Sequence, residues 1–341
     1  PPSPLLPFFL FLSPPLTSTL LPFSNMLSLL FLTTVFSPAF CLEELSLTLH
    51  GSGTTNPSKL LWHAGALFEE WSKIPLHLTY RAVGSSTGRA EFVAGVNDYA
   101  ASELPLPEDV YNEVTQGGTV QILHVPMALG TVSFFHSLPI PADTQLNLTA
   151  AVAARLFTRN ITSWSDQAVL DLNPALAATD TASLPPVTIV HRVFGSSSTY
   201  LTSEFLTAAA PDEWTLRSAS GASVAATLEW PEDTTGAEGS GGVTSVIQTV
   251  PGALGYIDSG HGLAFQLSEV AVQNADGNFL TSSQADVGSA ADSAALPESP
   301  ADSWHAVTLV NQAGPSAWPM TTFTYLLLNA SQTFRQEAGE Q

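Results

Sequence analysis

The chain has 341 residues, of which 45% are hydrophobic and only 11% charged. It is long and apolar enough to form two globular domains, and this composition excludes an intrinsically disordered chain. The formal net charge of −21 opposes binding to nucleic acid or to an anionic membrane. It does not oppose capture of a small anion by local donors, because salt screens long-range repulsion beyond about 8 Å.

The first 41 residues are apolar and interrupted by prolines, so no stretch before Met26 is smooth enough for a membrane-spanning helix. From Met26 the segment MLSLLFLTTVFSPAFC has the short apolar core and small residues of a secretory signal. We predict residues 1–41 to be a leader, with Met26 as the true start and Cys41, the only cysteine, at the cleavage point. A hydrophobic leader without this role is the alternative.

Three Asn-X-Ser/Thr triplets, at Asn147, Asn160 and Asn329, suit export through a glycosylating pathway. Together with the leader they predict a secreted glycoprotein, periplasmic or extracellular. After signal removal we expect no disulfide and no insertion into a membrane.

Polar loops follow predicted strands along the first part of the chain. A strand at 45–50 leads into Gly51–Pro57 and then into a helix, and a strand at 77–80 leads through Gly84–Gly88 into a second helix. A third strand, 98–102, ends at Glu103.

The middle of the chain predicts two adjacent strands, 120–125 and 131–135, around Pro126 and Gly130, which we interpret as a crossover between domains. A helix follows at 150–157. The stretch 187–206, VTIVHRVFGSSSTYLTSEFL, then repeats the order of strand, Gly/Ser/Thr loop and helix.

The last part of the chain contains a fourth candidate loop, Gly236–Gly242, which precedes a helix and then a strand ending near Ile257. Residues 273–303 are rich in Ala, Ser and Asp and predict a surface excursion with at most one weak helix. A final strand is expected at 320–328.

These loops point to anion binding. A helix N-terminus presents unpaired backbone N–H groups and the positive end of the helix dipole, so a loop of Gly and hydroxyl residues leading into it can surround an oxyanion. Arg192, at the end of the strand before the 195–199 loop, adds a planar charged donor. Strands alternating with helices predict parallel sheets, whose ligands gather at the carboxyl ends of the strands.

Seven ordered blocks resemble the phosphate-binding proteins of bacterial phosphate ABC transporters: GSGTTNP (51–57), YRAVGSSTG (80–88), NDYAASE (97–103), TRNITSWSD (158–166), VHRVFGSSST (190–199), VPGALGYID (250–258) and AWPMTTFTYLLL (317–328). The resemblance covers roughly residues 45–328. It implies an α/β fold of the periplasmic-binding-protein type II class, in which two α/β domains enclose a ligand cleft and are joined by crossover hinge strands.

The same resemblance implies domain boundaries. Residues 42–128 are expected to start the first domain, 129–258 to form the second, and 259–341 to return to the first, with 273–303 as the excursion. Related chains continue through further helices after the position of Leu328, so the resemblance implies a truncated C-terminus here.

The resemblance also implies a phosphate site. Carried over position by position, its residues are Thr54, Thr55, Asn56, Ser85, Glu103, Arg192, Ser196, Ser197 and Ser198. Two departures stand out: Glu103 occupies the position of a shorter aspartate, and Phe194 occupies that of an acidic residue that resembles a partner for the arginine. An ionised Glu103 accepts a hydrogen bond from protonated phosphate and repels fully ionised sulfate.

The implied function is capture of inorganic phosphate by a monomeric, non-catalytic protein for delivery to an ABC permease, without cofactor or metal. Two alternatives remain open. Gly84–Gly88 also matches G-x-S-x-G, with Ser86 as the nucleophile of a secreted phosphatase or hydrolase. The second alternative is a degenerate member of the family that serves as a recognition module and binds no oxyanion.

Individual residues have plainer interpretations. In these structural interpretations, Arg192 forms a surface ion pair, Glu103 is a solvated carboxylate and His191 is a polar residue at a strand end. The tryptophans are expected in core or interdomain packing: Trp62, Trp71, Trp164, Trp214 and Trp318.

Overall fold

The computed structural model describes residues 47–141, 144–292 and 294–331, so the predicted leader, Met26 and Cys41 lie outside the described residues. The strands are β1 (Leu47–Gly53), β2 (Leu76–Ala82), β3 (Tyr99–Ser102), β4 (Ile122–His136), β5 (Asn147–Leu148), β6 (Thr188–Arg192), β7 (Thr235–Ala237), β8 (Ala253–Asp258), β9 (Ser268–Glu269), β10 (Ala271–Gln273), β11 (Phe279–Leu280), β12 (Leu309–Val310) and β13 (Met320–Asn329).

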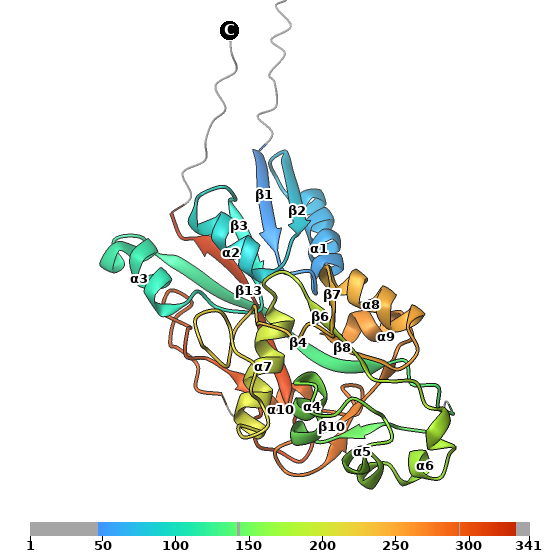
Figure 1. The fold of residues 1–341 in the computed structure, drawn as a ribbon. Coiled ribbons are helices and arrows are strands. Elements are labelled where there is room, and N and C mark those ends of the chain that lie inside the picture. Colours follow the sequence, from blue (N-terminus) through green and yellow to red (C-terminus); the bar gives the residue numbers. More distant parts are fainter. Residues whose placement is uncertain (1–46, 142–143, 293, 332–341) are drawn as a thin grey trace, which may run out of the picture. The chain divides into compact units, whose positions relative to one another are not determined.

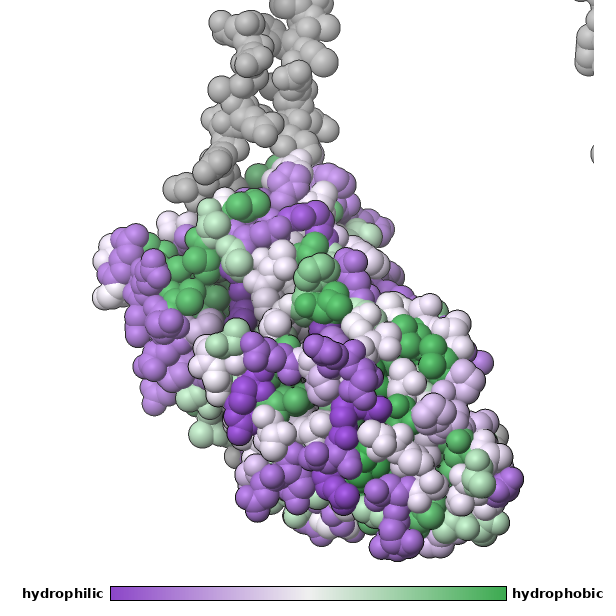
Figure 2. All heavy atoms as spheres, in the orientation of Figure 1, coloured by the Kyte–Doolittle hydropathy of each residue, from purple (hydrophilic) through white to green (hydrophobic). Residues whose placement is uncertain are grey.

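The helices are α1 (Ser58–Trp71), α2 (Ser85–Val93), α3 (Glu108–Thr115), α4 (Ala150–Phe157), α5 (Gln167–Leu172), α6 (Pro174–Ala177), α7 (Ser197–Ala209), α8 (Gly239–Thr249), α9 (Ser259–Ala264) and α10 (Val287–Asp292), with short 3-10 turns at Gln116–Gly118 and Thr181–Ser183. None of these described helices combines the length and apolar character needed to cross a bilayer. On the face drawn in Figure 2, apolar side chains form separate patches among polar ones.

A mixed sheet connects two α/β lobes (Figure 1). Its strand order is β2-β1-β3-β13-β4-β8-β6-β7, with β12 attached to β13 and β9 to β4. The pairs β2–β1–β3 at one end and β8–β6–β7 at the other are parallel, whereas β13 and β4 run antiparallel to their neighbours in the middle. We call the β1–β3 end the first lobe and the β6–β8 end the second lobe.

The long strands β4 and β13 pass through both lobes. Tyr325–Leu328 of β13 pair with β3 in the first lobe, while Met320 and Thr321 pair with β12. The prediction of two separate strands around Pro126 and Gly130 is wrong, because β4 continues from Ile122 to His136. A shift in its pairing with β13 between Thr324 and Tyr325 accommodates Pro126, which has no N–H to donate.

In the first lobe, α1 packs against β2 at the edge of the sheet and leaves its outer side in solvent. Trp62 is 51% exposed and Trp71 is 73% exposed, so the prediction that they pack in a core is wrong. Gly65 of α1 faces the strand, where Leu78 lies beneath it, and the Trp62 indole donates to the Tyr80 carbonyl of β2 at 3.0 Å. Trp164, Trp214 and Trp318 are buried as predicted.

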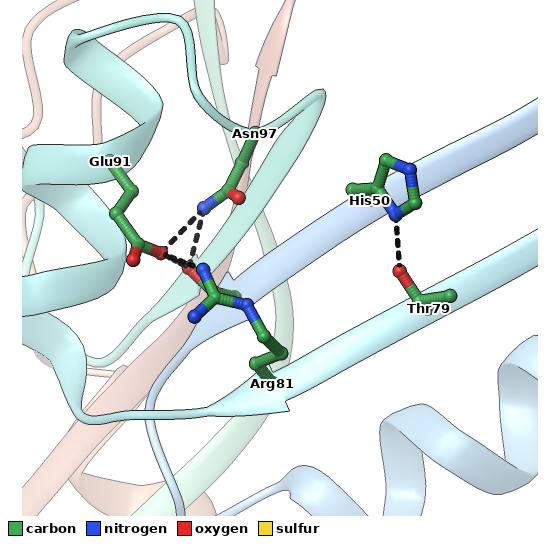
Figure 3. A network of polar contacts seen from close by, with 6 residues as sticks. His50, Thr79, Arg81, Glu91 and Asn97 are labelled. Carbon is green, nitrogen blue, oxygen red and sulfur yellow. Dashed lines mark hydrogen bonds and ion pairs between the residues drawn. The ribbon is translucent and has the colours of Figure 1, made fainter.

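A network around Glu91 fixes α2 to the first-lobe strands (Figure 3). The Glu91 carboxylate accepts hydrogen bonds from Arg81 (2.7 Å), Asn97 (3.0 Å) and Ser52. These bonds lower the pKa of Glu91 to about 2. Because Glu91 lies on the second turn of α2, the network also fixes where that helix begins.

The second lobe contains the larger core. Val132 and Phe134 of β4 pack with α4 and α7 on one face of the sheet, and Phe135 packs with Val243 of α8 on the other. The helices begin at side-chain caps: Thr149 accepts from the Val152 N–H at the start of α4, and Ser196 accepts from Ser198 at the start of α7.

The chain after Asp258 contributes to both lobes. Val272, Val310 and Met320 pack in the core of the second lobe, whereas Trp304 and Leu327 pack in that of the first. The stretch 273–303 contains the short helix α10 together with β11, which forms a hairpin with β10 that the composition did not predict. In the first-lobe core, Trp304 and Leu327 pack with Phe92, Ala100 and Leu106.

Two glycine substitutions test this packing with opposite signs. A Cβ on Gly88 of α2 would lie 2.3 Å from the Gly53 Cα, so G88A is expected to destabilise the fold by roughly 2 kcal/mol or more. A Cβ on Gly65 of α1 would make only ordinary contacts with Leu78 at 3.8 Å, so G65A is expected to stabilise it by about 1 kcal/mol. Urea unfolding of both variants measures the difference, and equal effects would contradict the packing described.

Candidate functional site

The side chain of Glu103 lies where the two lobes meet. It directly follows β3 and is 1% exposed. From the loop after β1, Thr54 Oγ1 donates to the carboxylate at 3.0 Å and the Asn56 side-chain amide donates as well. From the second lobe, the hydroxyl of Ser197 donates to the same carboxylate. Four of the predicted site residues are therefore in contact.

A second hydrogen bond crosses between the lobes. Thr55 Oγ1 lies 3.2 Å from Ser240 Oγ, at the first turn of α8. Ser240 was not among the predicted site residues, although Gly236–Gly242 was a candidate loop. The signal in the sequence was the loop itself, which cannot specify which of its hydroxyls faces the opposite lobe.

The Gly84–Gly88 loop touches the other lobe, where the side chain of Ser86 lies against the backbone of Gly195. Gly84, with φ of +95°, begins α2, and a Cβ on Gly195 of the second lobe would lie 2.7 Å from Ser86 Oγ. The two loops therefore approach more closely than side chains allow. Among the described residues no histidine forms a hydrogen bond with Ser86, so the serine of the G-x-S-x-G match has no adjacent general base; the one serine–histidine hydrogen bond within the described chain joins Ser303 to His305, at the surface.

Arg192 is 6% exposed at the end of β6, next to the first turn of α7. Its backbone N–H donates to the Tyr256 hydroxyl at 3.2 Å. Within the described chain Arg192 forms no ion pair, and its Nε has no hydrogen-bond partner. Phe194 is 59% exposed, and its side chain has no negative charge and no oxygen that could accept a hydrogen bond from the guanidinium.

Three buried donors of the predicted site have no partner among the described residues. They are Ser85 Oγ at the start of α2, Ser198 Oγ in the first turn of α7, and Arg192 Nε. Ser196 caps α7 and is satisfied by that role. The structure brings Ser85 and Ser198 to helix starts beside the contact residues, but no hydrogen bond joins them to Glu103.

Burial dominates the electrostatics of the site. It raises the pKa of Glu103, while the hydrogen bonds from Ser197, Asn56 and Thr54, and then the charge of Arg192, lower it. Burial lowers the pKa of Arg192, which Tyr256 and Glu103 oppose. The arrangement is one buried carboxyl and one buried guanidinium among neutral donors.

Asp258, at the end of β8, is a second carboxyl that sequence reasoning did not single out. It caps α9 by accepting from the backbone N–H groups of Gly260 (3.1 Å) and His261 (3.3 Å). Burial, and then the nearby Glu103, raise the pKa of Asp258 to about 7. Its only signal in the sequence was its position at the end of the VPGALGYID block.

No group of three or more His, Cys, Asp or Glu side chains within the described ranges is arranged to hold a metal ion. His191 lies at the strand end and stacks on Trp230, with ring centroids 4.6 Å apart.

Comparison with known proteins finds relatives over most of the chain. A family model described as a PBP superfamily domain matches residues 43–337. The chain is 32% identical over 255 residues to the phosphate-binding protein PstS of Xylella fastidiosa, an alignment covering 74% of this chain and 64% of that protein. It is 26% identical over 303 residues to PstS of Pasteurella multocida, covering 87% and 80%. The chain thus spans somewhat under two thirds of the length of the Xylella relative.

Solved structures share the fold. A phosphate-binding protein from Stenotrophomonas maltophilia superposes with a TM-score of 0.59 at 19% identity, covering 83% of this chain and 79% of that one. A high-affinity periplasmic phosphate-binding protein, solved with phosphate bound, superposes with a TM-score of 0.60 at 20% identity, covering 83% and 80%. These neighbours match the two-lobed α/β architecture built above.

The pKa of Asp258 predicts a pH-dependent stability. Because its pKa in the folded state is about 7, above its ordinary value of 3.8, the carboxyl contributes stability below about pH 4 that is lost as pH rises through 7. The difference in free energy of unfolding between the wild type and D258N is therefore expected to shift against the wild type from pH 5 to pH 8. Urea unfolding at both pH values measures it, and an unchanged difference would contradict this assignment.

Proposed function

Because the chain belongs to the PBP superfamily, we propose that it captures inorganic phosphate between its lobes for delivery to an ABC permease. One observation supports this above the others. Ser85 Oγ, Arg192 Nε and Ser198 Oγ are buried donors without partners in the described chain, and an unsatisfied buried donor costs about 1–3 kcal/mol. An oxyanion beside Glu103 satisfies all three.

The ligand residues that we propose come from both lobes. Thr54, Thr55, Asn56, Ser85 and Glu103 belong to the first, and Arg192 with Ser196, Ser197 and Ser198 to the second. Neutral hydroxyl and N–H donors can surround a dianion without importing an equal positive charge. Glu103 accepts the hydrogen bond of the proton that phosphate carries and sulfate lacks. The side chain of Glu103 is one methylene longer than that of the aspartate expected at this position, and its carboxylate accepts hydrogen bonds from donors of both lobes.

Release and capture would follow from bending of the crossover strands. The polar contacts between the lobes include Ser197 with Glu103, Thr55 with Ser240, and Lys59 of α1 over the Phe265 ring at 5.9 Å, in addition to the approach of Ser86 to Gly195. Breaking them separates the donors without disrupting either core. Hinge closure through β4 and β13 is the motion that we propose.

The wider biology is proposed on the same basis. Relatives named for phosphate binding support a transport role, and we propose a non-catalytic monomer that acts outside the cytoplasm after removal of the leader 1–41. We place the first domain at 42–128, the second at 129–258 and a mixed contribution after residue 258. Glycosylation at Asn147, Asn160 and Asn329 stays a prediction.

Removal of the buried cation tests the ligand. R192A is expected to weaken phosphate binding at least tenfold, or about 1.4 kcal/mol or more, because Arg192 supplies the charged donor of the site. R155A, which alters an arginine of α4 in the same lobe, is the matched control and is expected to bind within twofold of the wild type. Isothermal titration calorimetry with phosphate measures both. Equal affinities in the two variants would refute the assignment.

The raised pKa of Glu103 predicts selectivity that depends on pH. Protonation converts the acceptor into a donor, so sulfate binding to the wild type is expected to strengthen as pH falls from 8 to 5. E103Q donates at every pH and is expected to bind sulfate at least tenfold more tightly than the wild type at pH 8. Asp258 titrates nearby, so comparison with E103Q isolates Glu103. Sulfate affinity that falls toward acid pH would speak against this role.

A further inference from the structure

A cavity of about 340 Å³ lies between the lobes, separate from the donors assigned to phosphate. It is one turn further along the two helices that begin at the phosphate site: Arg89 of α2 lines one side, and Tyr200 and Glu204 of α7 line the other. The crossover strand β13 contributes Thr322 to its wall. Of the residues proposed for phosphate, Glu103 alone borders this space.

One end of the cavity carries an unpaired cation. Arg89 Nη1 donates to the Pro105 carbonyl at 2.5 Å, while its Nε is buried and has no partner among the described residues. No carboxylate in the described ranges forms an ion pair with Arg89. A buried guanidinium without a counter-charge favours an anionic occupant.

Two further donors stand beside this cation. The charge of Arg89 lowers the pKa of the Tyr200 hydroxyl, against the larger effects of burial and of Glu204, so the three groups are neighbours. Burial raises the pKa of Glu204, with Thr308 opposing it. In its protonated form Glu204 would donate a hydrogen bond to an anion instead of repelling it.

The rest of the lining combines apolar side chains with the polar side chains of His305, Thr308 and Thr321. Leu104, Leu106 and Leu201 contribute aliphatic wall, and Val307, Phe323 and Tyr325 close the opposite side. A space of this size, with an apolar wall and a few converging polar groups, has the make-up of a small-molecule site. A free inorganic anion would leave that wall uncovered.

We propose that this cavity binds a small organic carboxylate, with its carboxylate at Arg89 and Tyr200 and its apolar body against Leu106, Val307 and Phe323. This second site goes beyond phosphate capture and does not depend on it. The negative net charge of the chain does not prevent it, because the cation and donors act within a few ångströms.

Calorimetry on the full chain with benzoate, in saturating phosphate, tests the proposal. Benzoate is expected to bind, and benzamide, which has the same ring without the charge, to bind at least tenfold more weakly. R89Q is expected to weaken benzoate binding at least tenfold while phosphate affinity changes less than twofold. Y200F is expected to weaken benzoate binding about threefold.

Two further variants keep the test decisive. A306W fills the cavity from an exposed position of its lining and is expected to abolish benzoate binding even where R89Q fails to fold by circular dichroism. R192A is expected to retain benzoate binding whether or not it binds phosphate, which separates this proposal from the phosphate assignment. Absence of benzoate binding, equal binding of benzamide, or one-for-one competition with phosphate would overturn it.

Discussion

A buried carboxyl that receives hydrogen bonds from both lobes organises this molecule. Glu103 is removed from water at the end of β3, and its cost of burial is met by Thr54 and Asn56 on one side and Ser197 on the other. A carboxyl in such a place is stable only while both lobes contribute donors. The relative position of the lobes and the protonation of Glu103 are consequently linked.

The crossover strands make this linkage mechanically possible. Because β13 pairs with β3 of the first lobe, β4 pairs with β8 of the second, and the two strands pair with each other, the sheet is continuous from β2 to β7, and each lobe keeps a core of its own. The interlobe contacts described above are hydrogen bonds, one ring contact and the approach of Ser86 to Gly195, and they are separate from both cores. A ligand that accepts hydrogen bonds from donors of both lobes stabilises the closed arrangement, and the free energy of a few such bonds is enough to shift the equilibrium between open and closed arrangements.

Local features of this fold were predictable, and pairings across the lobes were not. The starts of α2 at Ser85 and α7 at Ser197 follow from a strand, a Gly/Ser loop and helical spacing within about twenty residues. The bond between Thr55 and Ser240 joins residues 185 positions apart, and no local pattern specifies it. Trp71 shows a different limit: periodicity identifies the apolar side of α1, but not whether another element covers it. The cavity beside Arg89 escaped for the same reason, since six separate segments of the chain line it.

The most direct test is a crystal structure with phosphate bound. We expect one phosphate between the lobes, with its proton directed at the Glu103 carboxylate and its oxygens within hydrogen-bond distance of Arg192, Ser85 and Ser198. A phosphate held elsewhere, or a Glu103 that keeps its bond to Ser197 with no anion beside it, would contradict the account.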